Sequence, residues 1–97
     1  MTSKQRAYLR SISSGIEPIF QIGKNGVTPE VIKSIDEALE AREIIKGTVL
    51  NNCLLDIRDI CDIISERTRS ETVQIIGKKI VFFRVSKKNP AIDISKI

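Results

Sequence analysis

The sequence predicts one α/β domain of the α+β two-layer type, in which an N-terminal helix precedes the order βαβαββ and the strands form a four-stranded mixed sheet. Three observations support this prediction. Apolar residues recur at helical spacing in three segments, short apolar runs separate those segments, and a Gly-Lys pair joins two such runs near the C-terminus. We expect the domain to span residues 1–86, followed by a polar tail of loose structure over residues 87–97.

The first expected helix is capped by Thr2 or Ser3 and runs to about Ser14. Its apolar stripe is formed by Tyr8, Leu9, Ile12 and Ile16. Arg6 and Arg10 are four residues apart, so we expect them to share the face that points away from this stripe.

A buried strand over residues 18–22 and an amphipathic helix over residues 29–42 are expected next. Thr28 suits the N-cap of this helix, and Pro29 suits its first position. The apolar face of the helix is formed by Val31, Ile32, Ile35, Ala38 and Leu39. A second strand should cover residues 43–50, with Gly47 as a bulge or a point of close approach.

Asp56 can cap a third helix, with Leu55 and Ile60 in the positions of a hydrophobic staple. The buried stripe of this helix is formed by Ile57, Ile60, Cys61 and Ile64. Its opposite face is acidic and carries Asp59, Asp62 and Glu66. We interpret that face as a solvated surface, because nothing converges on it to perturb a pKa.

The last two strands are expected over residues 72–76 and 79–85, as an antiparallel hairpin joined by a type II′ turn at Gly77-Lys78. Direct pairing across this turn sets Ile75 opposite Ile80 and Val73 opposite Phe82, so these four side chains should form one face. Val81 and Phe83 should form the other. The first two strands should be parallel, because a helix connects them; strand order is not readable from the pattern.

The loop Gly23-Lys24-Asn25-Gly26 is the strongest functional candidate. It places a lysine between two glycines, directly before a capped helix whose first turn offers unpaired N–H groups. Such a loop is a plausible phosphate seat, of the kind by which KH modules clamp a nucleic-acid backbone. The alternative is a purely structural turn, because Asn-Gly is among the commonest turn dipeptides.

Charge is distributed unevenly along the chain. Residues 1–29 carry a net charge of +3, residues 30–72 a net charge of −4 and residues 73–97 a net charge of +5. A polyanion would therefore meet the N-terminal helix, the glycine loop and the C-terminal strands, and would be repelled by the middle helices. Basic residues that serve only solubility are the alternative explanation.

The composition also limits the chemistry. The chain has no histidine, which excludes histidine-based catalysis and His-ligated zinc, and its two cysteines lack metal or redox spacing. We expect no enzymatic activity, no cofactor and no small-molecule substrate. No apolar run is long enough to span a membrane, and no signal peptide is evident, so we expect a cytoplasmic monomer without membrane association.

The chain resembles the CRM-domain family (chloroplast RNA splicing and ribosome maturation) in its bacterial single-domain YhbY branch. The resemblance covers roughly residues 3–85, and its matching segments are residues 4–10, 18–28, 35–46, 69–71 and 73–78. Two positions depart from the family pattern: Gly47, where a β-branched residue is often found, and the aromatic pair Phe82-Phe83.

This resemblance implies an RNA-binding fold similar to the C-terminal domain of bacterial translation initiation factor 3, association with precursors of the large ribosomal subunit, and no catalysis. It places the family's G-x-x-G loop on residues 23–26. Together with the charge pattern, the expected RNA-binding residues are Gly23, Lys24, Asn25, Gly26, Thr28, Lys4, Arg6, Arg10, Lys78, Lys79 and Arg84. The rival interpretation is a protein-binding adaptor that docks ribosomal proteins or other factors through its acidic helices.

Overall fold

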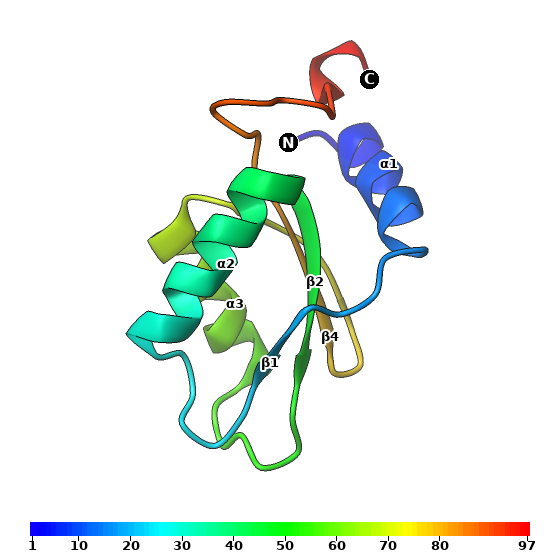
Figure 1. The fold of residues 1–97 in the computed structure, drawn as a ribbon. Helices are drawn as coiled ribbons and strands as arrows, with labels where there is room; N and C mark the ends of the chain where they lie inside the picture. The colour runs from blue at the N-terminus through cyan, green and yellow to red at the C-terminus, as the bar shows by residue number, and fades with distance from the viewer.

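The computed structural model describes the backbone of residues 1–97 and every side chain except that of Lys96. The elements occur in the predicted order (Figure 1), and the predicted fold class is confirmed. They are α1 (Ser3–Ser13), β1 (Phe20–Ile22), α2 (Pro29–Arg42), β2 (Ile44–Val49), α3 (Ile57–Thr68), β3 (Glu71–Ile76), β4 (Lys79–Phe83) and the short 3-10 helix η1 (Ile94–Lys96). Within this described chain, every helix is too short or too polar to cross a bilayer.

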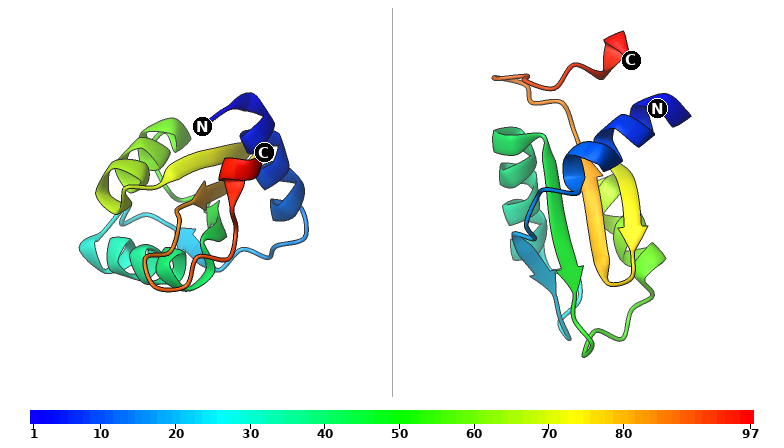
Figure 2. Two further views of the ribbon diagram at one scale, coloured as in Figure 1. Left: turned by 90° about the horizontal axis from the view of Figure 1, so that it is seen from above. Right: turned by 90° about the vertical axis from the view of Figure 1, so that its right-hand side faces the viewer.

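The strands form one sheet in the order β1-β2-β4-β3. β1 and β2 are parallel, as the connecting helix α2 predicts, and the other two pairs are antiparallel. Helices α2 and α3 cover one face of the sheet, whereas α1 crosses only part of the opposite face (Figure 2). The remaining part of that face carries no helix, which matters for the site described below.

Two apolar cores hold the sheet between these layers. The larger core lies against α2 and α3 and is formed by Ile22, Ile35, Leu39, Ile45, Val49, Ile60, Cys61, Ile64, Ile80 and Phe82. The smaller core lies under α1 and is formed by Leu9, Ile44, Val73, Val81 and Phe83. β2 and β4 contribute to both cores, because successive residues of a strand point to opposite faces.

The helix starts follow from local chemistry. At α1, the Thr2 hydroxyl accepts from the Gln5 N–H at 3.1 Å, and the Gln5 amide oxygen accepts from the Thr2 N–H at 2.9 Å. This reciprocal capping box satisfies two backbone donors that would otherwise lack partners. Thr28 and Asp56 cap α2 and α3 as predicted.

The pairing of the C-terminal hairpin departs from the prediction at one residue. Ile75 pairs with Ile80 as expected, but Thr72, and not Val73, lies opposite Phe82. Val73 is the extra residue of a β-bulge, which reverses the facing of the chain beyond it. Its side chain therefore packs in the smaller core beneath α1 and not in the larger core.

Gly47 is a point of close approach, not a bulge. It pairs with Phe20 across β1 and β2, and a Cβ atom at this position would lie 2.2 Å from the Phe20 ring. The ring fills the space above the glycine and lies against Phe82, with 6.4 Å between ring centroids. The absence of a side chain at Gly47 thus lets a large aromatic residue enter the core.

The expectation of loose structure in the tail is wrong for residues 86–94. The buried Glu43 carboxylate accepts backbone N–H groups from Ser86 at 2.7 Å, Ala91 at 2.7 Å and Ile92 at 2.8 Å. Ile92 and Ile94 then pack against the smaller core. Glu43, predicted to begin the second strand, instead ends α2 with a positive φ of 67°, which turns its side chain toward the tail.

Candidate nucleic-acid interface

The loop over residues 23–26 forms a tight turn at the carboxyl end of β1. The Gly26 N–H donates to the Gly23 carbonyl oxygen at 3.0 Å, and Lys24 and Asn25 form the exposed outer corner of the turn. Neither of these two backbone N–H groups bonds to another described protein group. The turn therefore offers two backbone donors and one ammonium group to a ligand outside the protein.

The glycines let this turn fit against a neighbouring loop, residues 50–55. Gly26 has a positive φ of 67°, and a Cβ atom there would lie 3.0 Å from the Leu55 side chain. A Cβ atom on Gly23 would meet Asn52 at an ordinary contact distance of 3.5 Å. Backbone conformation therefore requires glycine at position 26 more strictly than at position 23.

The N-terminus of α2 is less open to a phosphate than the sequence suggests. Pro29 has no N–H, and the Val31 N–H donates to the Thr28 hydroxyl at 3.2 Å. The remaining donor of the first turn belongs to Glu30, whose own carboxylate would repel an anion. Thr28 therefore acts as a helix cap in this structure, and the turn itself is the better candidate for an anion contact.

The strand order brings two further predicted lysines to the same end of the sheet. β1 and β2 finish side by side at Ile22 and Val49, and the Val49 N–H donates to the Lys78 carbonyl oxygen at 2.8 Å. Lys79 donates from Nζ to the Thr48 hydroxyl at 3.0 Å. We call this end the tip and define it by Lys24, Asn25, Lys78 and Lys79, all of which are exposed.

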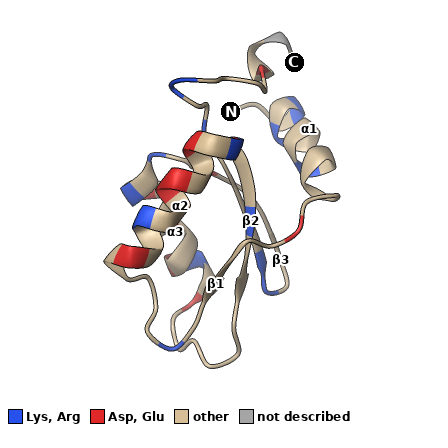
Figure 3. Cartoon of the chain, viewed as in Figure 1, with Lys and Arg blue, Asp and Glu red and all other residues tan. Residues whose placement is uncertain are grey.

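The predicted residues of α1 do not join the tip. Figure 3 shows α1 toward the other end of the sheet, away from the glycine loop. Lys4 and Arg10 are exposed, whereas Arg6 is half-buried and donates to the carbonyl oxygens of Thr72 and Val73 at the β3 bulge. The helical spacing predicted that Arg6 and Arg10 would share an open face. This prediction is wrong, because Arg6 is half-buried against β3 while Arg10 is exposed.

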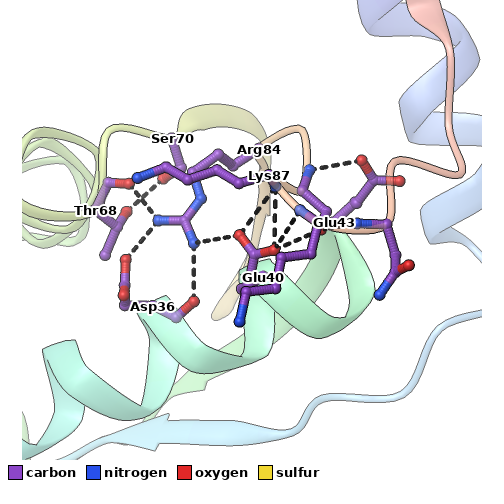
Figure 4. A network of polar contacts seen from close by, with 10 residues as sticks. Asp36, Glu40, Glu43, Thr68, Ser70, Arg84 and Lys87 are labelled. Carbon is purple, nitrogen blue, oxygen red and sulfur yellow. Dashed lines mark hydrogen bonds and ion pairs between the residues drawn. The ribbon is translucent and has the colours of Figure 1, made fainter.

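Arg84 lies inside a network of polar contacts (Figure 4). Its Nη1 donates to Asp36 Oδ1 at 2.5 Å and to the Thr68 carbonyl oxygen at 2.7 Å, and its Nη2 donates to the Asp36 carbonyl oxygen at 2.9 Å. Only 15% of its side chain is exposed. Arg84 therefore joins β4 to α2 and α3, and its guanidinium group is largely occupied by the protein.

One lysine that the sequence analysis did not select does lie near the tip. In β2, Ile44 faces the smaller core, so the alternation places Lys46 and Thr48 on the same face. The pairing register extends this face across the sheet, where α1 leaves it uncovered. Its residues are Gln21, Lys46, Thr48, Gln74, Ile76 and Lys79. None of them is acidic, and the alternating pattern of β2 was the signal that could have identified Lys46.

The loop beside the tip contributes an apolar group that the sequence analysis also passed over. Leu54 is 96% exposed, and Asn51 and Asn52 beside it are exposed too.

Within the described residues, no group of three or more potential metal ligands is present. The tip and the uncovered sheet face therefore offer cations, amides and backbone donors, which are groups that bind an anionic polymer.

Comparison with known proteins agrees with this chemistry. Residues 1–84 match the family described as the CRS1 / YhbY (CRM) domain. The probable RNA-binding protein YqeI of Bacillus subtilis is 47% identical over 94 residues, covering 97% of this chain and 98% of that protein. The probable RNA-binding protein PA4753 of Pseudomonas aeruginosa is 31% identical, covering 93% and 84%. The solution structure of the hypothetical protein SAV1595 from Staphylococcus aureus superimposes with a TM-score of 0.80 at 50% identity, covering 96% and 97%.

Proposed function

We propose, from the premise that the chain belongs to the CRS1 / YhbY (CRM) domain family, that it binds structured ribosomal RNA in precursors of the large ribosomal subunit. One observation supports this most directly. The strand order β1-β2-β4-β3 brings the glycine turn and the Lys78-Lys79 turn to one end of the sheet, beside a face without acidic residues. Such a surface suits a binding function, and no catalytic group is assigned to it.

In this proposal the RNA backbone provides most of the contacts. Lys24, Lys78 and Lys79 neutralise phosphates, and the backbone N–H groups of the glycine turn donate to phosphate oxygens. Base stacking contributes little, because all three phenylalanines pack into the two cores and Tyr8, 43% exposed, lies on α1 away from the tip. Shape and phosphate geometry, not base sequence, would then determine which RNA is bound.

The experiment measures the affinity for ribosomal RNA fragments at several salt concentrations. If three to five phosphates are neutralised, log K should fall against log salt with a slope of roughly −2 to −4.5. The double variant Lys24→Ala, Lys78→Ala should weaken binding and flatten the slope by roughly 1.4 to 1.8. Lys33→Ala, an exposed lysine of α2, is the matched control and should change neither. Lys24 is a cleaner target than Gly26, where any side chain would strain the positive φ.

Two outcomes would contradict the proposal. The first is a slope near zero, which would mean that phosphates are not the contacts. The second is an unchanged affinity in the double variant while circular dichroism shows the native fold. Tight binding of a basic ribosomal protein, lost on reversal of Asp59 and Asp62 to lysine, would instead support the adaptor function, because these exposed carboxylates form the outer face of α3.

A further inference from the structure

A second basic site lies at the opposite end of the sheet from the tip. Arg84 follows Phe83, which pairs with the first residue of β2, whereas the tip adjoins the last. A cavity of about 210 Å³ opens here between α2, the end of α3 and the segment after β4, lined by Asp36, Arg67, Thr68, Arg69, Arg84 and Lys87. This volume is below the roughly 300–1,000 Å³ of pockets that hold drug-sized ligands, so a small group is the better match.

The acidic groups around this cavity already have partners. Asp36 forms the ion pair with Arg84 at 2.5 Å. Glu40 lies 4.0 Å from Arg84, and its carboxylate accepts the Ser86 hydroxyl and the backbone N–H groups of Lys87 and Lys88. Both carboxylates thus bond to groups of the protein, and the charge of Arg84 offsets one of their two negative charges.

The cations around the cavity are not committed in this way. Arg67, Arg69 and Lys87 are exposed, and none of the three side chains forms an ion pair or a hydrogen bond with a residue that the structure describes. Arg67, Arg69 and Lys87 therefore line a small cavity without ion-pair partners of their own, and these three cations exceed the one carboxylate charge that Arg84 leaves unpaired. This arrangement suits an anion with several acceptor oxygens.

The backbone at Arg69 supplies an independent observation. Arg69 has a φ of 56° in the left-handed region, at a helix end where glycine or asparagine is usual. Arg69 and Glu43 are the two described non-glycine residues with positive φ. At Glu43 the side chain makes three hydrogen bonds that offset the strain, whereas the Arg69 side chain makes no contact of that kind. The positive φ at Arg69 ends α3, where the N–H groups of Arg69 and Ser70 both donate to the Ser65 carbonyl oxygen, and glycine would serve this turn with less strain. The fold therefore does not require the arginine side chain, and strained positions of this kind are concentrated at binding sites.

We propose that the cavity lined by Arg67, Arg69 and Lys87 binds a phosphate group of the RNA as a second anchoring point. This inference rests on the proposed function for the source of the phosphate. The acidic outer face of α3 would repel RNA along that helix, so the tip and this cavity contact separate segments of a folded RNA. Because the length of β2, about 20 Å, separates the two sites, a very short single strand bound at the tip would leave the cavity empty.

The test exploits the strain at Arg69. Arg69→Gly removes the cation and relieves the positive φ, so the variant should unfold at the same temperature as the unchanged protein or higher. Its affinity for a folded ribosomal RNA fragment should fall roughly three- to tenfold, and the salt slope should flatten by about 1. Arg69→Lys keeps the charge and should bind within about twofold. Arg67→Gln provides a second variant outside the strained position, with an expected loss similar to that of Arg69→Gly.

Several results would overturn the inference. If Arg69→Gly lowers the unfolding temperature and leaves RNA affinity unchanged, Arg69 serves the fold. If the Lys24 and Lys78 variant loses affinity and the cavity variants do not, the second site is rejected while the tip remains. If titration with inorganic phosphate shifts the amide resonances of residues 68–70 and 87 but RNA does not, the cavity takes free phosphate and the assignment to RNA is wrong.

Discussion

The two ends of the sheet use basic residues in different ways. At the tip, Lys24 and Lys78 are exposed and none of the described carboxylates pairs with them. At the other end, Arg84 is enclosed by Asp36, Thr68 and Glu40, and it holds β4 against two helices. A basic residue can contribute to an RNA-binding surface only if its side chain is not already paired with other groups of the protein.

The neighbouring Glu43 shows the same contrast for a carboxylate. Only 2% of this residue is exposed. Burial raises the pKa of its carboxyl, but the backbone N–H groups of Ser86, Ile92 and Ala91 outweigh that effect and lower the pKa below its ordinary value. The charged form is thus held by donors of the tail, so Glu43 serves stability, and at this end only the exposed cations Arg67, Arg69 and Lys87 remain for binding. At the tip no such network exists, and all of its lysines are exposed.

The largest expected effect is that of removing this buried carboxylate. Glu43→Ala leaves three backbone N–H groups without acceptors, and each such loss costs about 1 kcal/mol or more, so the free energy of unfolding should fall by about 3 kcal/mol. Glu43→Gln keeps one acceptor oxygen and should lose about half as much. Urea denaturation measures both. A loss below about 1 kcal/mol in the alanine variant would show that the tail does not depend on Glu43.

A somewhat smaller loss of stability is expected when Arg84 is replaced, and this variant tests the contrast between the two ends of the sheet directly. Arg84→Met removes the bonds to Asp36 and Thr68 and should lower the free energy of unfolding by about 2 kcal/mol, while the affinity for a short RNA strand that contacts only the tip stays unchanged. Lys24→Ala should do the reverse, with stability within about 0.5 kcal/mol of the original and weaker RNA binding. If Arg84→Met retains stability and loses RNA affinity, Arg84 is an RNA contact, as its sequence position suggested.

Much of the fold was predictable because it depends on local chemistry. The bounds of α2 were predicted correctly from Thr28 and Pro29 at its start and the apolar period that follows. The parallel pair and the hairpin followed from the element order. The β3 bulge was not predictable in this way, because placing Val73 under α1 depends on the packing of a helix some 60 residues earlier in the chain.

The site was predictable in its parts but not in its arrangement. The glycine loop and Lys78-Lys79 were identified from the sequence, yet only the strand order places them together. Arg84 looked like a free cation because its partner Asp36 lies 48 positions away in sequence. Glu43 looked like the start of a strand, since nothing local shows that its carboxylate binds the tail. Long-range pairing decides which charges remain available, and spacing along the chain does not reveal it.

The smallest effect on stability is expected when the pH is lowered, and it should appear only at the end of the molecule that holds Glu40 and Glu43. Chiefly the Ser86 hydroxyl, together with the N–H groups of Lys87 and Lys88, lowers the pKa of Glu40 from 4.5 to about 2. The pKa of Glu43 is also lowered, so both carboxylates stabilise the fold above their unfolded pKa values. This contribution should be lost as the pH falls from about 4.5 toward about 2. In that range the unfolded chain binds protons more tightly than the folded protein does, so acid favours the unfolded state.

Amide hydrogen exchange and NMR spectra recorded across that range measure the effect. The amide groups of residues 86–88, 91 and 92 should lose protection first, because their acceptors are the carboxylates that become protonated. The amides of β1 and β2 next to the tip should change only when the whole domain unfolds, because their acceptors are backbone carbonyl groups. Equal loss of protection at both ends, or greater stability in acid, would show that the carboxylates do not hold the tail and would remove the contrast between the two ends of the sheet.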